Sequence, residues 1–210
     1  MNRMRTDFGL RLAGSAGVSR TAPATSRWPW ATVLAAALLL ATCAFPARGA
    51  DVAPLAPGDR LPPLKGELLS GPRVVLPDSA AGRPVFLLLG FSYESRHDVE
   101  KWAARFRAEF GSHPRLGFYE VPVIGTAGRL GRPFIDGSMR RGLPREMHAH
   151  VLMVYRDAGL WKRLTGHRDP NVGYLLLVGP DGRVAWRAHG PFGEPAWREA
   201  AEHLARLAAE

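Results

Sequence analysis

The stretch Val85–Phe91 (VFLLLGF) carries no polar side chain, and an amphipathic pattern begins a few residues after it. A strand that is apolar on both faces is typical of the centre of a sheet that is covered on both sides. In the segment that follows, apolar side chains recur at three- and four-residue spacing until Gly111: Val99, Trp102, Ala103, Phe106 and Phe110. A buried strand that leads directly into a helix predicts an α/β fold.

The rest of the pattern predicts the other elements. We expect strands at 74–76, 116–124, 174–178 and 183–188, the last two joined as a hairpin by Pro180-Asp181-Gly182. The stretch 125–143 is rich in glycine and arginine and predicts an irregular segment. A helix is expected to resume at Pro144, with these apolar residues on one face: Met147, Val151, Val154 and Tyr155. A final amphipathic helix is expected at 195–208.

Two segments resemble thioredoxin-like proteins. Gly82–Leu89 is similar to the strand that precedes their redox motif, and Val178–Val184 is similar to their closing hairpin. The resemblance implies a thioredoxin-like three-layer α/β/α sandwich with a mixed sheet over residues 71–210. Where those proteins place Cys-x-x-Cys and a basic residue, this chain reads Ser92-Tyr93-Glu94-Ser95-Arg96.

Cysteine is absent from the whole of this predicted domain, because the only cysteine is Cys43. Disulfide exchange needs a thiolate, and a serine hydroxyl is far too weakly acidic to replace it. No phosphate-binding glycine loop, zinc-protease motif or nucleophile elbow occurs either. We therefore expect no enzymatic activity and no cofactor.

A finer resemblance comes from short motifs in the second half of the chain. Gly173-Tyr174, Gly182-Arg183-Val184 and Ser138-Met139-Arg140 followed by Leu143-Pro144 are similar to the assembly factor for the F0 sector of mitochondrial ATP synthase. This resemblance implies a non-catalytic assembly factor or chaperone that binds a membrane-protein client such as an F0 subunit. The alternative is a periplasmic redoxin-like module that binds a peptide or small ligand.

The first group of candidate binding residues lies around the replaced redox motif: Ser92, Ser95, Arg96, Gly173 and Tyr174. The helix that follows the motif would present free N–H groups there, which favour an anion or carboxylate. The simpler interpretation is that Ser95 only caps the helix, with Asp98 completing a capping box.

The second group consists of arginines in and near the irregular segment: Arg129, Arg132, Arg140, Arg141 and Arg145. Such a cluster predicts a surface for a protein partner or for anionic lipid. The alternative is a solvated insertion in an arginine-rich chain. Outside the N-terminal segment the chain carries only a small excess of positive charge, so we expect no nucleic-acid binding.

Histidine and methionine cluster at Met147-His148-Ala149-His150 and Met153. Thioether and imidazole groups suit copper. On a helix, however, His148 and His150 would point in different directions, because side chains two residues apart do not share a face. We therefore expect no metal site.

The N-terminal part divides into three segments. Residues 1–27 are basic, residues 28–47 contain no charge and form a hydrophobic helix that is either a signal peptide or a transmembrane anchor, and residues 48–70 form a proline-rich linker. Lipid attachment at Cys43 is a further alternative. The arginines before the apolar segment place the domain in the bacterial periplasm, anchored to the inner membrane or exported; the alternative is the mitochondrial inner membrane.

Overall fold

The computed structural model describes residues 52–80 and 82–209, so the expected signal peptide or anchor at 28–47 and Cys43 lie outside the described residues. The strands are β1 (Leu64–Leu68), β2 (Arg73–Leu76), β3 (Val85–Gly90), β4 (Gly117–Pro122), β5 (Leu152–Met153), β6 (Gly173–Val178) and β7 (Val184–Gly190). The α-helices are α2 (Ser95–Phe110), α3 (Arg132–Gly142), α4 (Ala158–Thr165) and α5 (Glu194–Ala209). Short 3-10 helices are η1 (Asp78–Ala80), η2 (Thr126–Arg129) and η3 (Arg145–Ala149).

The central sheet has the order β4-β3-β6-β7. β3 runs parallel to β4 and antiparallel to β6, and β6 and β7 form the expected antiparallel hairpin. The expected mixed sheet is therefore confirmed. Its central strand β3 is buried from Val85 to Leu89, as a run without polar side chains requires.

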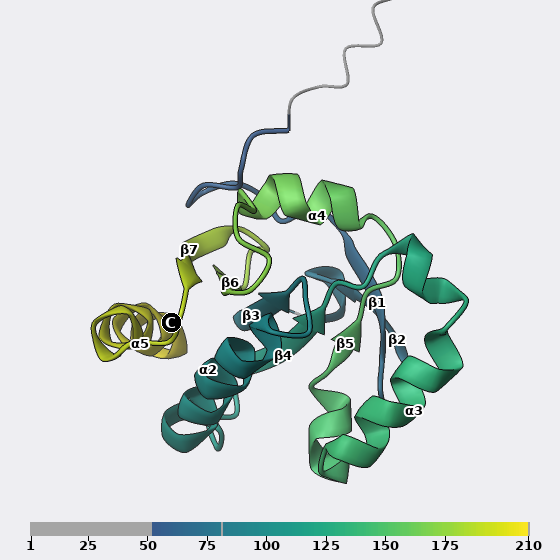
Figure 1. Ribbon diagram of the computed structural model, residues 1–210. Coiled ribbons are helices and arrows are strands. Elements are labelled where there is room, and N and C mark those ends of the chain that lie inside the picture. Colours follow the sequence, from purple (N-terminus) through teal and green to yellow (C-terminus); the bar gives the residue numbers. More distant parts are fainter. Residues whose placement is uncertain (1–51, 81, 210) are drawn as a thin grey trace, which may run out of the picture. The chain divides into compact units, whose positions relative to one another are not determined.

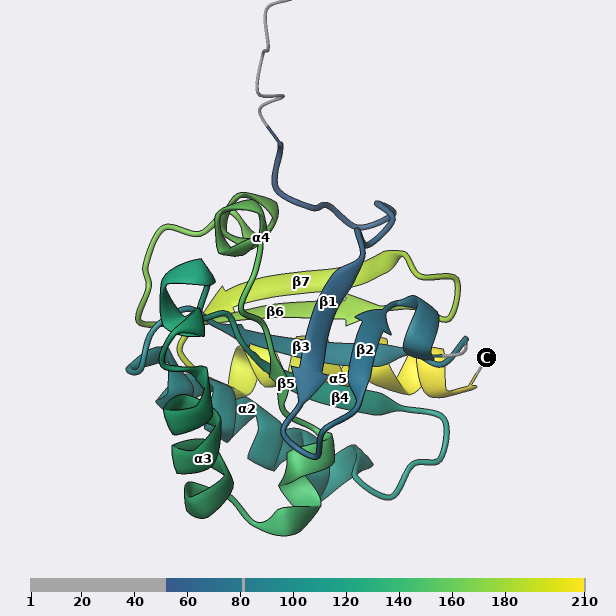
Figure 2. The same ribbon diagram turned by 90° about the vertical axis from the view of Figure 1, so that its right-hand side faces the viewer.

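Helices cover both faces of this sheet (Figures 1 and 2). Alternate residues of β3 divide between two cores, because side chains of a strand point to opposite faces in turn. Phe86 and Leu88 pack in the core that α2 and α5 complete with Trp102 and Trp197. The other core joins Leu87 and Leu89 to α4 and to the hairpin of β1 and β2. The amphipathic helices predicted at the start and end of the domain are thus found where expected.

A second, smaller sheet has the order β2-β1-β5. It continues from the edge of the central sheet, because single bridges join Glu120 to Val151 and Val123 to Val154. The prediction of an α-helix from Pro144 is wrong, because only the 3-10 helix η3 forms there and the strand β5 follows it. Residues 151–154 are apolar in succession and all are at most 2% exposed, so they suit a strand with both faces covered.

Two further expectations about segments are corrected. Residues 125–143 were expected to be irregular, but they contain α3, which packs Ile135 and Met139 against Val151 and Met153. The segment 48–70, expected to be a linker, contains β1, and both Leu61 and Leu64 are at most 1% exposed. The domain therefore begins before residue 71. None of the helices in the described part is both long and apolar enough to cross a membrane.

Candidate functional site

The turn between β3 and α2 holds Ser92 and Ser95, the two serines that the resemblance places where thioredoxin-like proteins have their redox cysteines. The Ser95 hydroxyl is fully buried, donates to the carbonyl oxygen of Ser92 at 2.8 Å and accepts from the Ser92 N–H at 3.2 Å. The Ser92 hydroxyl in turn accepts from the Ser95 N–H at 3.1 Å. Ser95 is therefore the first helical residue and does not act as the N-cap, which is Glu94 without a capping hydrogen bond from its side chain.

Replacement of Ser95 by alanine is expected to destabilise the domain by about 1–2 kcal/mol, because a buried hydroxyl that both donates and accepts is lost. Ser92→Ala is expected to lower the free energy of unfolding by only about 0.5–1 kcal/mol. Ser92 is half-buried, and its hydroxyl acts as a weak cap of the Ser95 N–H. Urea unfolding of both variants measures the difference. If both variants lost the same free energy of unfolding, the burial of the Ser95 hydroxyl would not explain its contribution to stability.

Gly173 and Tyr174 lie behind this turn and have different roles. Gly173 packs against the start of α2, where a Cβ atom would come within 3.7 Å of the Val99 side chain. The Ser92 hydroxyl reaches the same segment through a hydrogen bond to Asn171 Oδ1 at 3.2 Å. Tyr174 is 1% exposed, and its hydroxyl donates to the carbonyl oxygen of Asp169 at 2.9 Å. The tyrosine therefore holds the preceding loop rather than lining an open site.

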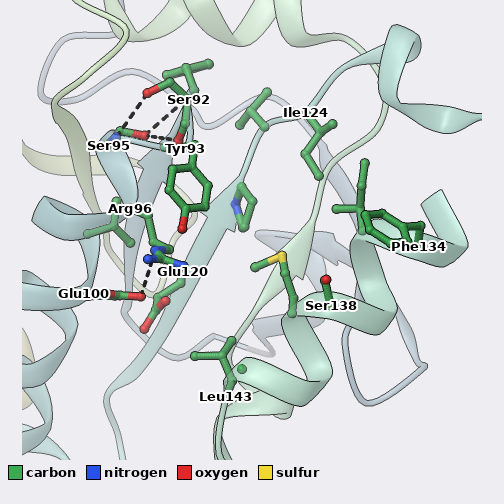
Figure 3. Close-up of a pocket in the computed structure, with 18 residues that line it drawn as sticks. Ser92, Tyr93, Ser95, Arg96, Glu100, Glu120, Ile124, Phe134, Ser138 and Leu143 are labelled. Atoms are coloured by element: carbon green, nitrogen blue, oxygen red, sulfur yellow. Dashed lines mark hydrogen bonds and ion pairs between the residues drawn. The ribbon is translucent and has the colours of Figure 1, made fainter. Parts of the chain in front are cut away.

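An open pocket of about 580 Å³ lies between the start of α2 and α3 (Figure 3). Ser92, Ser95 and Arg96 line one side, so these three predicted residues do share a site. The rest of the lining is mainly apolar: Phe91, Val99, Val123, Ile124, Ile135, Met139 and Leu143. Two aromatic side chains of the lining are strongly exposed, Tyr93 at 69% and Phe134 at 75%. Exposed aromatic groups beside an apolar pocket are typical of a binding surface.

The acidic side of the pocket is formed by Glu100 and Glu120. Glu100 pairs with Arg96 at 3.3 Å, and the Arg96 guanidinium also lies 4.6 Å from the centre of the Tyr93 ring. Glu120, on β4, is only 8% exposed. Burial and, to a lesser degree, repulsion by Glu100 raise the pKa of Glu120 from 4.5 to about 7, against a smaller opposing effect of Arg107. This carboxyl therefore changes its charge near neutral pH.

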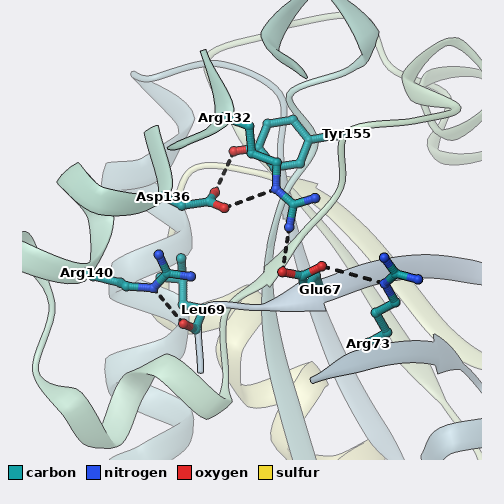
Figure 4. A network of polar contacts seen from close by, with 7 residues as sticks. All are labelled: Glu67, Leu69, Arg73, Arg132, Asp136, Arg140 and Tyr155. Carbon is teal, nitrogen blue, oxygen red and sulfur yellow. Dashed lines mark hydrogen bonds and ion pairs between the residues drawn. The ribbon is translucent and has the colours of Figure 1, made fainter. Parts of the chain in front are cut away.

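The predicted arginine cluster is largely engaged in contacts within the domain (Figure 4). Arg132 pairs with Glu67 on β1 at 2.6 Å and with Asp136 at 3.2 Å, and Arg140 donates to the carbonyl oxygen of Leu69 at 2.8 Å. These contacts fasten α3 to the second sheet. Arg141 donates to the Ser138 hydroxyl at 3.3 Å. The exposed arginines at 129 and 145 lie in η2 and η3, so a partner surface on these five residues remains a prediction.

Asp136 and Tyr155 form the buried part of the same network. The Tyr155 hydroxyl donates to Asp136 Oδ1 at 2.6 Å, and Asp136 is 5% exposed. Burial and then the hydrogen bond to Asp136 raise the pKa of Tyr155, so this hydroxyl stays protonated. The Arg132 guanidinium lies 5.2 Å from the centre of the Tyr155 ring. The position of α3, which forms one wall of the pocket, thus depends on the hydrogen bonds and ion pairs of Asp136 with Tyr155 and Arg132.

His148 and His150, which were considered as metal ligands, both contact backbone carbonyl oxygens. His148 Nε2 lies 3.2 Å from the carbonyl oxygen of Leu143, and His150 Nδ1 lies 3.3 Å from that of Phe118. Across residues 52–80 and 82–209, no three histidine, cysteine, aspartate or glutamate side chains come together as a metal site.

Sequence reasoning missed the residues that shape the pocket most: Tyr93, Glu100, Glu120 and Phe134. One signal was present for Glu120, since an acid in the middle of an otherwise apolar strand is rarely buried without a reason. Phe134 gave no such signal, because the segment around it was expected to be irregular.

Comparison with solved structures shows the fold. A candidate protein disulfide isomerase from Bacteroides thetaiotaomicron matches with a TM-score of 0.55 and 12% identity, over 74% of this chain and 92% of that chain. A candidate thiol:disulfide interchange protein DsbE from Chlorobium tepidum matches with a TM-score of 0.52 and 17% identity, over 73% and 99%. BsSco, of the Sco family of cytochrome c oxidase assembly proteins, matches with a TM-score of 0.52 and 14% identity, over 74% and 98%. The chain has a thioredoxin-like fold.

No protein-family model matches the sequence, and no curated protein matches it. The expectation that the chain is not an enzyme is contradicted by the structural comparison, because structures that share its fold include a candidate disulfide isomerase and a candidate interchange protein. The lack of cysteine at residues 52–210 concerns thiol exchange only. It does not exclude other chemistry at this end of the sheet.

Proposed function

We propose that the pocket between α2 and α3 binds an apolar segment of a client membrane protein, and that the chain assists the assembly of a membrane complex. The F0 sector of ATP synthase is the proposed complex, on the resemblance of the motifs around Gly173 and Ser138. The domain would act on the periplasmic side of the membrane, held there or exported by residues 28–47.

The observation that carries this proposal is the aromatic rim of the pocket. Tyr93 lies just before α2 and Phe134 lies on α3, and both are strongly exposed beside the apolar lining of the pocket (Figure 3). Water contact with such groups is unfavourable, so a protein segment that covers them gains hydrophobic free energy. The resemblance of the fold to BsSco adds support, because that protein belongs to a family of assembly proteins for another membrane complex.

A second candidate function is supported by the size of the pocket. A volume of about 580 Å³ falls in the range that holds small organic ligands. In this alternative the chain is a periplasmic module of the redoxin type that retains a small molecule or a short peptide between α2 and α3.

Affinity purification of the full chain from solubilised membranes separates the two candidates. We expect a membrane protein in stoichiometric amount, identified as an F0 subunit by mass spectrometry, and less assembled ATP synthase on native gels of a strain without the gene. Phe134→Ser should reduce the recovered client about tenfold, because aromatic anchors carry much of the binding energy at interfaces. The exposed Arg198→Ser, on α5, is the control. A retained small molecule without a protein client would favour the alternative.

A further inference from the structure

Glu120 is the one acidic group in the pocket that the described residues leave without a partner. Its carboxylate makes no ion pair or side-chain hydrogen bond with any residue among 52–80 and 82–209, although it is only 8% exposed. Its oxygens are nevertheless not enclosed, because neither is among the fully buried polar atoms that lack a partner. Since Glu120 lines the open pocket, a bound ligand could replace the water at this carboxylate with a charged donor.

The charged groups around Glu120 do not neutralise it. On α2, Arg96 already pairs with Glu100, and the exposed Arg107 only partly offsets the repulsion from Glu100. On the neighbouring segment, His150 presents its backbone oxygen, which accepts from the Glu120 N–H at 2.8 Å, while its ring nitrogen contacts the carbonyl oxygen of Phe118. His148 is directed to the carbonyl oxygen of Leu143. The pocket therefore joins an apolar lining to a carboxyl that lacks a cation.

From this geometry we infer that the pocket selects a basic side chain, lysine or arginine, within the apolar client segment. Its methylene stem would pack between Val99 and Met139, and its cationic end would reach the carboxylate of Glu120. Long basic side chains suit such a site because they combine an apolar stem with a charged tip. This inference rests on the proposed function, and it adds the chemistry by which a client would be recognised.

The pH dependence of binding follows from the free state of Glu120. Without ligand, this carboxyl is half protonated near pH 7. A cation binds the ionised form, so binding must expel the proton at lower pH. Affinity for a lysine side chain should therefore fall about tenfold from pH 8 to pH 6, and a ligand of the same shape without charge should show no such change.

The test uses two short peptides, acetylated and amidated Gly-Leu-Lys-Leu-Gly and the same peptide with norleucine in place of lysine. Norleucine keeps the apolar stem and lacks the ammonium group. Binding to the full chain in lipid nanodiscs is measured by calorimetry at pH 6 and pH 8. We expect the lysine peptide to bind about tenfold more tightly than the norleucine peptide at pH 8, as for a buried charge pair.

Glu120→Gln should remove both this preference and its pH dependence, while binding of the norleucine peptide stays unchanged. Glu94→Gln, which removes the same charge from an exposed residue in the turn between β3 and α2, is the matched control and should keep the preference. Equal affinity for both peptides in the unmodified chain would overturn the inference and leave the apolar pocket of the proposed function in place. If neither peptide bound, the further inference and the proposed function would both be overturned.

Discussion

The variant Glu120→Gln is expected to become more stable than the unmodified protein as the pH rises. The folded state binds the proton of Glu120 more tightly than the unfolded state does, because its pKa is about 7 instead of 4.5. This contribution to stability is fully present below pH 4.5 and is lost as the pH rises through 7. The loss amounts to about 3 kcal/mol between pH 4 and pH 8. Glutamine cannot ionise, so the variant avoids it.

Urea unfolding followed by tryptophan fluorescence at several pH values measures this difference. The free energy of unfolding of the variant minus that of the unmodified protein should rise by about 3 kcal/mol over that range. The change should be concentrated between pH 5 and pH 7.5. Glu94→Gln should follow the unmodified protein, because Glu94 is exposed. Parallel pH profiles for Glu120→Gln and the unmodified protein would show that this carboxyl ionises freely in the fold.

Removal of the Asp136 carboxylate is expected to loosen α3. Asp136→Ala leaves the buried hydroxyl of Tyr155 without its acceptor and takes one of two carboxylate partners from Arg132. The expected cost is about 2–3 kcal/mol, as for a buried polar group that loses a charged partner. The pocket wall should be affected as well, because α3 carries Phe134 and Met139. Urea unfolding gives the first effect, and affinity for the norleucine peptide gives the second.

Two further variants test whether the loss of stability comes from the contacts of Asp136. Tyr155→Phe removes the donor and should cost less, about 1–2 kcal/mol, because it leaves a carboxylate that Arg132 still binds. Arg141→Ala, at an exposed residue of the same helix, should change stability by less than about 0.5 kcal/mol. If Asp136→Ala lost no more stability than Arg141→Ala, the network of Figure 4 would not hold α3.

The core of the fold could be predicted from local sequence because its elements carry strong periodic signals. The run from Val85 to Leu89 has one apolar residue after another, and the Asp181-Gly182 turn sits between two β-rich segments. The faces of α2 and α5 repeat every three or four residues. In each case the signal lies within one short segment of the chain.

The parts that local sequence did not reveal depend on distant contacts. The strand β1 follows a proline-dense stretch, and its burial comes from packing against other segments of the core, among them Leu152. The helix α3 contains Pro133 and Gly137, which have low helix propensity, and its stability comes from Glu67 on β1 and from Tyr155. Tertiary contacts overrode local preference there.

The candidate site shows the same division. The serines at the positions expected for redox cysteines could be identified from the sequence, and Ser92, Ser95 and Arg96 do lie together beside the pocket. The pocket itself could not be predicted, since one wall is the unexpected α3. Glu120 acquires its raised pKa only when β4 is packed beneath α2.

The most direct test of the account is photo-crosslinking in living cells with a photoreactive amino acid in place of Phe134. We expect a crosslink to one membrane protein, an F0 subunit, at position 134 and also at the exposed Tyr93 across the pocket. The same probe at Arg198, on α5, should give no such product. Crosslinks of equal yield at all three positions, or none at 93 and 134 in cells that assemble the complex, would contradict a client site between α2 and α3.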